Sequence, residues 1–207
     1  MHKSIYISLS MVIDIFKRIK NMATVKVLLV GYFKWIKKDI CRASSTVTFI
    51  EDGKEKIIVD SGNACDAKKI ITALRKIKVR PEEITTVINT HSHSDHVGSN
   101  FIFRNARFVD GEGMYKDDEF NLGDIDNFAL TENIKIIKTP GHTPHDCSLL
   151  VKTKEGIVAV VGDLFWKEVN EKSSFIIDKN YIKKSQEKVL KNAQWIVPGH
   201  GEIFKIK

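Results

Sequence analysis

Apolar residues recur along most of the chain in short runs with the two-residue period of β-strands. Runs rich in Val, Ile, Thr and Phe predict strands at 24–33, 45–51, 56–60, 84–90, 106–110, 133–139, 147–152, 157–161 and 195–198. The Asp-Gly pair at Asp52 and Gly53 separates two of these runs, so it predicts the turn of a β-hairpin.

Two segments carry the longer period of a helix instead. In the first, Ala67, Ile70 and Leu74 fall on one helical face, and Pro81 limits how far the helix extends. A second helix is expected over 182–193. Groups of strands that alternate with helices predict a layered α/β protein with sheets packed inside helices. The chain shows no internal repeat or linker, and 207 residues suffice for one core, so we expect one domain over 23–207.

The first 22 residues, MHKSIYISLSMVIDIFKRIKNM, stand apart from this pattern. Asp14 interrupts their apolar run, no small-residue cleavage site follows, and the run is too short to span a bilayer. Ile13, Phe16 and Ile19 fall at helical spacing, so an amphipathic helix on a membrane surface is one interpretation. We favour a loose extension, or Met22 as the true first residue, and expect no membrane association.

The net charge of +7 is confined to one end of the chain. Residues 1–38 contain eight basic residues and one acidic residue, and the other 169 residues contain 25 of each. The charge therefore does not indicate a nucleic-acid-binding domain. The cysteines at 41, 65 and 147 are scattered and lack CxxC spacing. This pattern predicts reduced thiols, a cytoplasmic protein and no cysteine-bound zinc.

Three of the seven histidines lie in one stretch, INTHSHSDHVGSN at 88–100. In an extended segment His91 and His93 project to the same side and can share one ion, and Asp95 and His96 can reach a second. This spacing differs from HExxH, and a chance match is expected in well under about one chain in a thousand. Gly98 permits a sharp turn, after which we expect a helix to begin near residue 99.

Three downstream turns, each after an apolar run, supply the ligands that one loop lacks. They are IIKTPGHTP with His142, VAVVGDLFW with Asp163 and WIVPGHGEI with His200. Strand ends carry functional loops on a rigid scaffold, and a two-metal site needs such a second set of ligands.

With these residues in order, the chain resembles the metallo-β-lactamase superfamily from about residue 25 to its end. The resemblance implies a four-layered αββα sandwich, one metal bound by His91, His93 and His142, and a second bound by Asp95, His96 and His200. It further implies that Asp163 bridges the two ions. Asp60, in IIVDSG, corresponds to the superfamily's structural aspartate, which supports the histidine loop without binding metal.

VLLVGY, RASSTVTFI, THSHSDHVGS and PGHTPHDCSLLV are similar to the metallo-β-lactamase domain-containing protein 1 family, which is associated with histone pre-mRNA 3′-end processing in animals. Asp163 stands where zinc β-lactamases typically have cysteine, which argues against antibiotic hydrolysis. The chain has no counterpart of the helical domain that follows in glyoxalase II-like thioesterases, or of the domain inserted in RNA-processing nucleases. We therefore expect a single domain to bind the substrate. A homodimer is one arrangement in which a second subunit would contribute to that binding.

Two bound ions would lower the pKa of water to about 7, so we expect a hydrolase that uses a metal-bridging hydroxide. Asp95 is the candidate to orient this nucleophile and to pass a proton to the leaving group. Zinc is the default metal, and iron or manganese also suits these ligands. The expected substrate is a small ester, thioester or lactone, or single-stranded RNA.

Two other function classes fit the pattern less well. A mononuclear iron persulfide dioxygenase would leave Asp95, His96 and His200 without a purpose, and a non-catalytic scaffold would not need every ligand. His145 and Asp146 are candidates to orient the ligands without binding metal, or else form a surface turn. Phe165 and Trp166 suit the core better than the pocket. The acidic stretch 114–127 is expected to be a solvated loop near the site.

Overall fold

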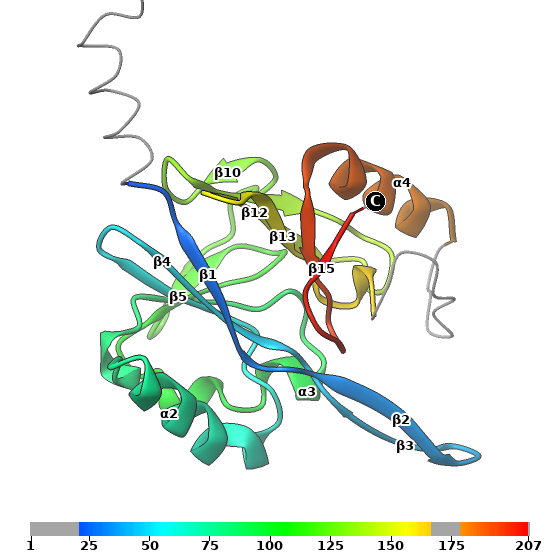
Figure 1. The fold of residues 1–207 in the computed structure, drawn as a ribbon, viewed down its shortest axis with the longest axis horizontal. Coiled ribbons are helices and arrows are strands. Elements are labelled where there is room, and N and C mark those ends of the chain that lie inside the picture. The colour runs from blue at the N-terminus through cyan, green and yellow to red at the C-terminus, as the bar shows by residue number, and fades with distance from the viewer. Residues whose placement is uncertain (1–20, 167–178, 207) are drawn as a thin grey trace, which may run out of the picture.

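The computed structural model describes residues 21–166 and 179–206 (Figure 1). Nearly all of the expected N-terminal extension at 1–22 lies outside the described residues. Within them, two large sheets form, and each predicted run contains a strand of one of them. Four further strands of these sheets lie outside the predicted runs, at Met114–Lys116, Glu119–Asn121, Phe128–Ala129 and Phe204–Lys205.

The first sheet has seven strands in the order β1-β4-β5-β6-β7-β8-β9. Its strands are β1 (Thr24–Leu29), β4 (Val47–Asp52), β5 (Glu55–Val59), β6 (Thr86–Ile88), β7 (Arg107–Val109), β8 (Met114–Lys116) and β9 (Glu119–Asn121). Its parallel neighbours are β5 with β6 and β6 with β7, and its other neighbouring strands are antiparallel. The predicted hairpin turn is confirmed, since Asp52 pairs with Glu55 and Gly53 takes a positive φ of 61°.

The second sheet has six strands in the order β10-β11-β12-β13-β14-β15. Its strands are β10 (Phe128–Ala129), β11 (Ile134–Lys138), β12 (Cys147–Thr153), β13 (Gly156–Val160), β14 (Trp195–Val197) and β15 (Phe204–Lys205). Strands β13 and β14 are parallel and the other neighbours are antiparallel. Helix α4 (Lys179–Asn192) forms the crossover between the parallel pair.

Side-chain alternation along the strands produces the layers. On β4 and β5, Phe49 and Ile58 face helix α2 (Ala67–Lys76), whereas Ile50 and Ile57 face the second sheet. The second sheet in turn packs its outer face on α4. The order α2, first sheet, second sheet, α4 confirms the expected four-layered αββα sandwich, and Figure 1 shows the two helices on opposite sides of the strands.

The prediction of one continuous strand over 24–33 was wrong. The chain leaves the first sheet after β1 and forms a separate hairpin of β2 (Tyr32–Lys37) and β3 (Ile40–Ser44), which projects from the body in Figure 1. Gly31 makes this exit possible, because a Cβ at that position would lie 2.4 Å from the nitrogen of Thr46 and 2.6 Å from the oxygen of Gly199.

Two local expectations also differ from the structure. The histidine loop contains its helical turn earlier than expected, as α3 (Ser94–Val97), and only a short 3-10 turn follows at Asn100–Ile102. Gly98 is needed for close approach, because a Cβ there would lie 2.5 Å from the nitrogen of Ala64. The acidic stretch 114–127 is not one loop, since it begins with the hairpin β8–β9.

The three cysteines carry free thiols, and burial raises the pKa of Cys147 well above its ordinary value. Among the described residues, no helix is long and apolar enough to cross a membrane.

Candidate metal centre

The predicted ligands lie directly after strands whose ends meet at one edge of the sandwich. The loop 89–98 follows β6, His142 follows β11, Asp163 follows β13 and His200 follows β14. Since β5 is parallel to β6, Asp60 at the end of β5 also reaches the same edge. The strands thus bring together residues that lie far apart in the sequence.

His91, His93 and His142 form the first group of ligand-type atoms. Nε2 of His91 and Nε2 of His142 each lie 3.0 Å from Nδ1 of His93. His91 and His142 are buried and His93 is exposed, so the group closes one side of the centre and opens to solvent on the other. Three nitrogens that converge in this way suit one divalent ion.

Asp95, His96 and His200 form a second group beside the first. Nε2 of His200 lies 3.8 Å from Oδ2 of Asp95. His96 and His200 are buried, whereas 18% of the Asp95 side chain is exposed. Asp95 and His96 both come from the turn of α3, which explains how neighbouring residues contribute to one group.

Asp163 lies between the two groups. Its Oδ2 is 3.4 Å from Nε2 of His142, on the first group, and its Oδ1 is 3.2 Å from Nε2 of His96, on the second. Nε2 of His200 lies 3.2 Å from Oδ1 and 3.3 Å from Oδ2. The carboxylate therefore offers one oxygen to each group.

The donor set fits bound cations. His96 Nε2 and Asp163 Oδ1 are fully buried, and neither has a hydrogen bond among the described residues. Buried polar atoms without partners are costly, and a cation between these two atoms would satisfy both. Imidazole and carboxylate are ligands that zinc, iron and manganese accept.

Asp60 and Thr90 fix the orientation of two of the histidines. Asp60 accepts hydrogen bonds from Thr90 N, from Thr90 Oγ1 and from His96 Nδ1, each at 2.8 Å. Because the Thr90 hydroxyl donates to Asp60, its oxygen is left to accept from His91 Nδ1 at 3.2 Å. In the neutral form of each imidazole the proton then lies on Nδ1, and Nε2 faces the centre without a proton, as metal ligation requires.

Backbone and carboxylate contacts hold two more of the histidines, His142 and His200. His200 Nδ1 donates to the carbonyl oxygen of Ser44, at the base of the hairpin, at 3.0 Å. Asp146 accepts from the backbone N–H of His142 at 2.8 Å and of Thr143 at 2.7 Å, which fixes the turn. The sequence identified Asp146 but gave no signal for Ser44, because a carbonyl contact does not depend on residue type.

The residues next to the ligand turns lie in different places. His145 is exposed and forms no hydrogen bond to the cluster among the described residues, while the adjacent Asp146 is buried. Phe165 packs in the core under α4, as expected. Trp166 is also buried, but its ring lies beside the cluster.

An aromatic wall borders the cluster on the hairpin side. The ring centroids of Phe33 and Trp166 are 4.6 Å apart, and that of Trp166 lies 5.5 Å from His200 and 6.4 Å from His142. Phe33 also contacts Trp35, with centroids 5.4 Å apart. A ligand at the cluster would meet apolar rings on this side.

The charge states follow from burial and from the carboxylates. Burial opposes the charged form of His96, but Asp60 and Asp163 outweigh it and raise its pKa well above the ordinary value. Burial also opposes the charged form of Asp163, yet His96 and His200 hold its pKa well below the ordinary value. Burial lowers the pKa of His91 well below the ordinary value. The same field that favours positive charge on His96 favours a bound cation.

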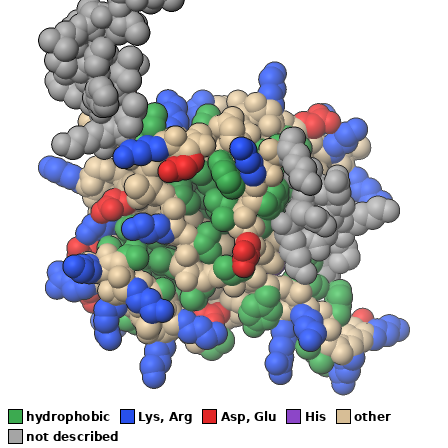
Figure 2. All heavy atoms as spheres, viewed as in Figure 1, with side chains coloured by type: hydrophobic (Ala, Val, Ile, Leu, Met, Phe, Trp, Pro, Cys, Tyr) green, Lys and Arg blue, Asp and Glu red, His purple; other side chains and the backbone are tan. Residues whose placement is uncertain are grey.

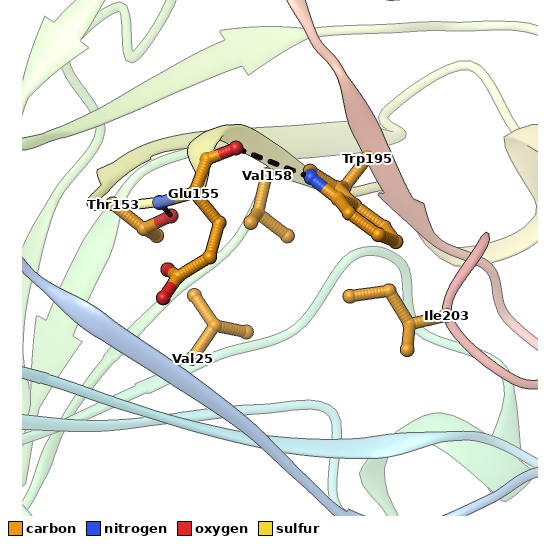
Figure 3. A pocket seen from close by; sticks show the side chains of 6 residues that line it. All are labelled: Val25, Thr153, Glu155, Val158, Trp195 and Ile203. Carbon is orange, nitrogen blue, oxygen red and sulfur yellow. Dashed lines mark hydrogen bonds between the residues drawn. The ribbon is translucent and has the colours of Figure 1, made fainter. Parts of the chain in front are cut away.

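A pocket of about 220 Å³ between the two sheets is a separate feature. Figure 3 shows Glu155 and Trp195 over an apolar lining that includes Val25, and Trp195 Nε1 donates to the backbone oxygen of Glu155 at 3.3 Å. Its lining includes none of the cluster residues and a single carboxylate, so it is not a metal centre.

Comparison with known proteins agrees with this geometry. A family model described as the metallo-beta-lactamase superfamily matches residues 42–133. The chain is 35% identical to metallo-beta-lactamase domain-containing protein 1 of Xenopus laevis over 191 residues, which is 88% of this chain and 82% of that protein. It is 33% identical to a protein named probable metallo-hydrolase from Methanocaldococcus jannaschii, covering 73% and 74%. An uncharacterized protein of Caenorhabditis elegans is 36% identical, and the match covers 79% of this chain but about half (49%) of that relative.

Solved structures share the fold at low sequence identity. A protein of Thermotoga maritima described as a metallo-beta-lactamase superposes with a TM-score of 0.72 at 20% identity, covering 89% of this chain and all of the other (100%). Bacillus thuringiensis AiiA, with N-decanoyl-L-homoserine bound at the active site, superposes with a TM-score of 0.65 at 16% identity, covering 87% and 93%.

Proposed function

Because this chain belongs to the metallo-β-lactamase superfamily, and within it to the metallo-β-lactamase domain-containing protein 1 family, we propose that it is a metal-dependent hydrolase with a dinuclear centre. In this proposal His91, His93 and His142 hold one ion, and Asp95, His96 and His200 hold the other. The observation that carries the proposal is the position of Asp163, which offers one carboxylate oxygen to each group.

The bound ions would supply a water of lowered pKa and would stabilise negative charge that develops on the substrate. The protein's own residues do the rest. Asp60 and Thr90 keep the proton of His91 and His96 on Nδ1, away from the centre. Of the two carboxylates in the cluster, Asp95 and Asp163, Asp95 has the more exposed side chain. It is therefore placed to accept a proton and to deliver it to the leaving group.

The metal is proposed to be zinc, with iron or manganese compatible with the same ligands. A complete second group of ligands supports two ions over one, and so supports the hydrolase over the mononuclear dioxygenase. A non-catalytic scaffold would not need every ligand of both groups to be present. The free thiols support a reducing, cytoplasmic location.

For the substrate we propose a small ester-like molecule, a thioester or lactone with an apolar group next to the bond that is cleaved. The wall of Phe33 and Trp166 beside His142 and His200 suits an apolar substituent. AiiA, which shares the fold, holds N-decanoyl-L-homoserine at its active site, and this molecule likewise carries an apolar acyl chain. Single-stranded RNA is the second candidate, since aromatic rings also stack on unpaired bases.

Elemental analysis of protein purified without added metal tests the proposal, together with a hydrolysis panel. The panel contains bis-p-nitrophenyl phosphate, a short single-stranded RNA, a thioester and a lactone. We expect about two ions per chain. We expect Asp163→Asn to abolish hydrolysis and to lower metal content, whereas the same change at exposed Asp124, in a surface ion pair with Lys138, should leave both unchanged.

One iron per chain, no hydrolysis and oxygen uptake with a persulfide would establish the dioxygenase instead.

Two further proposals use the same assays. The domain is proposed to span 23–207, so a chain that begins at Met22 should keep full activity. His145 is proposed to support His142 weakly, so His145→Ala should reduce kcat by less than tenfold, compared with a loss beyond a hundredfold for His142→Ala.

A further inference from the structure

Exposed apolar side chains gather on two surfaces that carry opposite charge. The hairpin surface contains exposed Val30, Tyr32, Ile36 and Ile40 together with Lys34, Lys37, Lys38 and Arg42. The edge surface contains exposed Phe120 and Leu122 together with three acidic residues, Asp117, Asp118 and Glu119, and one basic residue, Lys116. Exposed large apolar side chains surrounded by charged residues mark interaction sites.

The hairpin surface projects from the body on β2 and β3, where Figure 2 shows basic side chains around apolar ones at the lower right. Residues 30–44 include four basic residues and one acidic residue, Asp39. None of Lys34, Lys37 and Lys38 forms an ion pair with another described residue. The positive charge is therefore uncompensated within the described part of the chain.

Among the described residues, both surfaces also present strand edges that pair with no further strand. β9 is the last strand of the seven-stranded sheet, and β2 and β3 form a sheet of only two strands. Edge strands expose backbone N–H and C=O groups that pair readily with another strand. Like charges on two edge strands usually prevent the strands from pairing, because the charges repel each other. Here the two surfaces carry opposite charges, so they attract each other.

We propose that the hairpin surface of one copy of this chain docks on the edge surface of a second copy, so that the hairpin extends the seven-stranded sheet of its partner. Ile36 and Tyr32 would cover Phe120 and Leu122, and the lysines would face Asp118 and Glu119. Two such contacts related by a two-fold axis close a dimer. Each copy carries both halves of the contact, which makes a second copy the occupant that matches both surfaces. RNA or an anionic lipid surface would match the hairpin alone.

The dimer would also bear on the metal centre, and this consequence rests on the proposed function. The base of the hairpin holds His200 through the carbonyl of Ser44, and Phe33 on β2 borders the centre. Docking would fix the hairpin and with it the aromatic wall. The association itself does not depend on any chemistry at the centre, so metal content and activity test the two ideas separately.

A charge-exchange experiment with the full chain tests the proposal by light scattering coupled to size exclusion. The wild type should have twice the mass of one 23.5 kDa chain. Lys37→Glu/Lys38→Glu and Asp118→Lys/Glu119→Lys should each be monomeric, because each places like charges on both surfaces. An equimolar mixture of the two variants should recover the dimer, because each hairpin then meets an edge of opposite charge.

All four positions are exposed, so both variants should unfold at the wild-type temperature, which excludes misfolding as the cause of dissociation. A wild type that keeps the mass of one chain from micromolar to submillimolar concentration overturns the proposal, and so does a mixture that stays monomeric. Two further assays test the other ligands that the hairpin surface could bind. They measure co-sedimentation of the protein with phosphatidylserine vesicles and binding of a short RNA. Binding that only the hairpin variant loses, with a monomeric wild type, would reassign the hairpin surface to that ligand.

Discussion

The contacts of Asp60 give the most quantitative prediction, through the change Asp60→Asn. The buried carboxylate accepts three hydrogen bonds, from Thr90 N, Thr90 Oγ1 and His96 Nδ1, each at 2.8 Å. Asparagine keeps the size of the side chain but turns one acceptor oxygen into an NH₂ donor. Asp60 has a positive φ of 55°, a conformation that asparagine tolerates, so this change tests the side chain without adding backbone strain.

The magnitude follows from the bonds that are lost. Placing the NH₂ group toward His96 replaces Oδ2, which accepts from both Thr90 Oγ1 and His96 Nδ1, so two hydrogen bonds to a charged acceptor are lost. At the lower end of about 1.5–3 kcal/mol for each bond, the loss totals about 3 kcal/mol, because the Thr90 hydroxyl can rotate away from the NH₂ group. We therefore expect the free energy of unfolding to fall by about 3 kcal/mol, or by roughly 6–12 °C in Tm for a domain of this size. His96 can also regain a partner by moving its proton to Nε2, which would weaken metal binding about 10–100-fold.

Two measurements check the reasoning. Thermal unfolding of chelator-treated protein measures stability without metal, and competition with a zinc-binding dye measures the affinity of the centre. Asp124→Asn is the matched control, because 74% of that side chain is exposed and its ion pair with Lys138 lies at the surface. If Asp60→Asn unfolds at the wild-type temperature and binds zinc as tightly as the control, Asp60 does not orient His96 as described.

Three further changes test other parts of the structure. Gly31→Ala would place a Cβ 2.6 Å from the oxygen of Gly199, so we expect a loss of more than about 2 kcal/mol in urea unfolding and a fall in metal content. Leu149→Ala opens a cavity between the sheets and should cost about 2–5 kcal/mol in the same assay, with metal content unchanged. Lys56 lowers the pKa of Glu83 to about 2, so the ionised Glu83 stabilises the fold above its unfolded pKa of 4.5 and progressively less as the pH falls toward 2. The difference in Tm between wild type and Glu83→Gln should therefore be largest near neutral pH and vanish near pH 2, and a difference independent of pH would contradict this assignment.

The projecting hairpin connects the two proposals made for this protein. It contributes Phe33 to the wall beside the centre and the carbonyl of Ser44 to His200, and its outer residues form one of the two charged surfaces. A change at its tip should act on association, whereas a change at its base should act on the metal centre. Lys37→Glu/Lys38→Glu and Gly31→Ala separate these effects.

The sequence alone determined the features that depend on residue type and spacing. Alternation along β4 and β5 predicted the two-sided sheet, because neighbouring side chains of a strand face opposite layers. The loop from His91 to His96 and the turns with His142 and His200 indicated a metal centre, because imidazoles are too costly to gather in one place without a ligand. These local signals needed no knowledge of the fold.

Only the tertiary structure decided the features that depend on contacts between distant segments. The exit of the chain at Gly31 is required by the backbone at Gly199, which no local pattern reveals. The support of His200 by Ser44 is a bond to a backbone carbonyl, which every residue type can provide. Asp163 follows β13, and its place between two groups of histidines arises because strands from both sheets end at one edge. Spacing identified the ligands, but packing of the sheets set the distances between them.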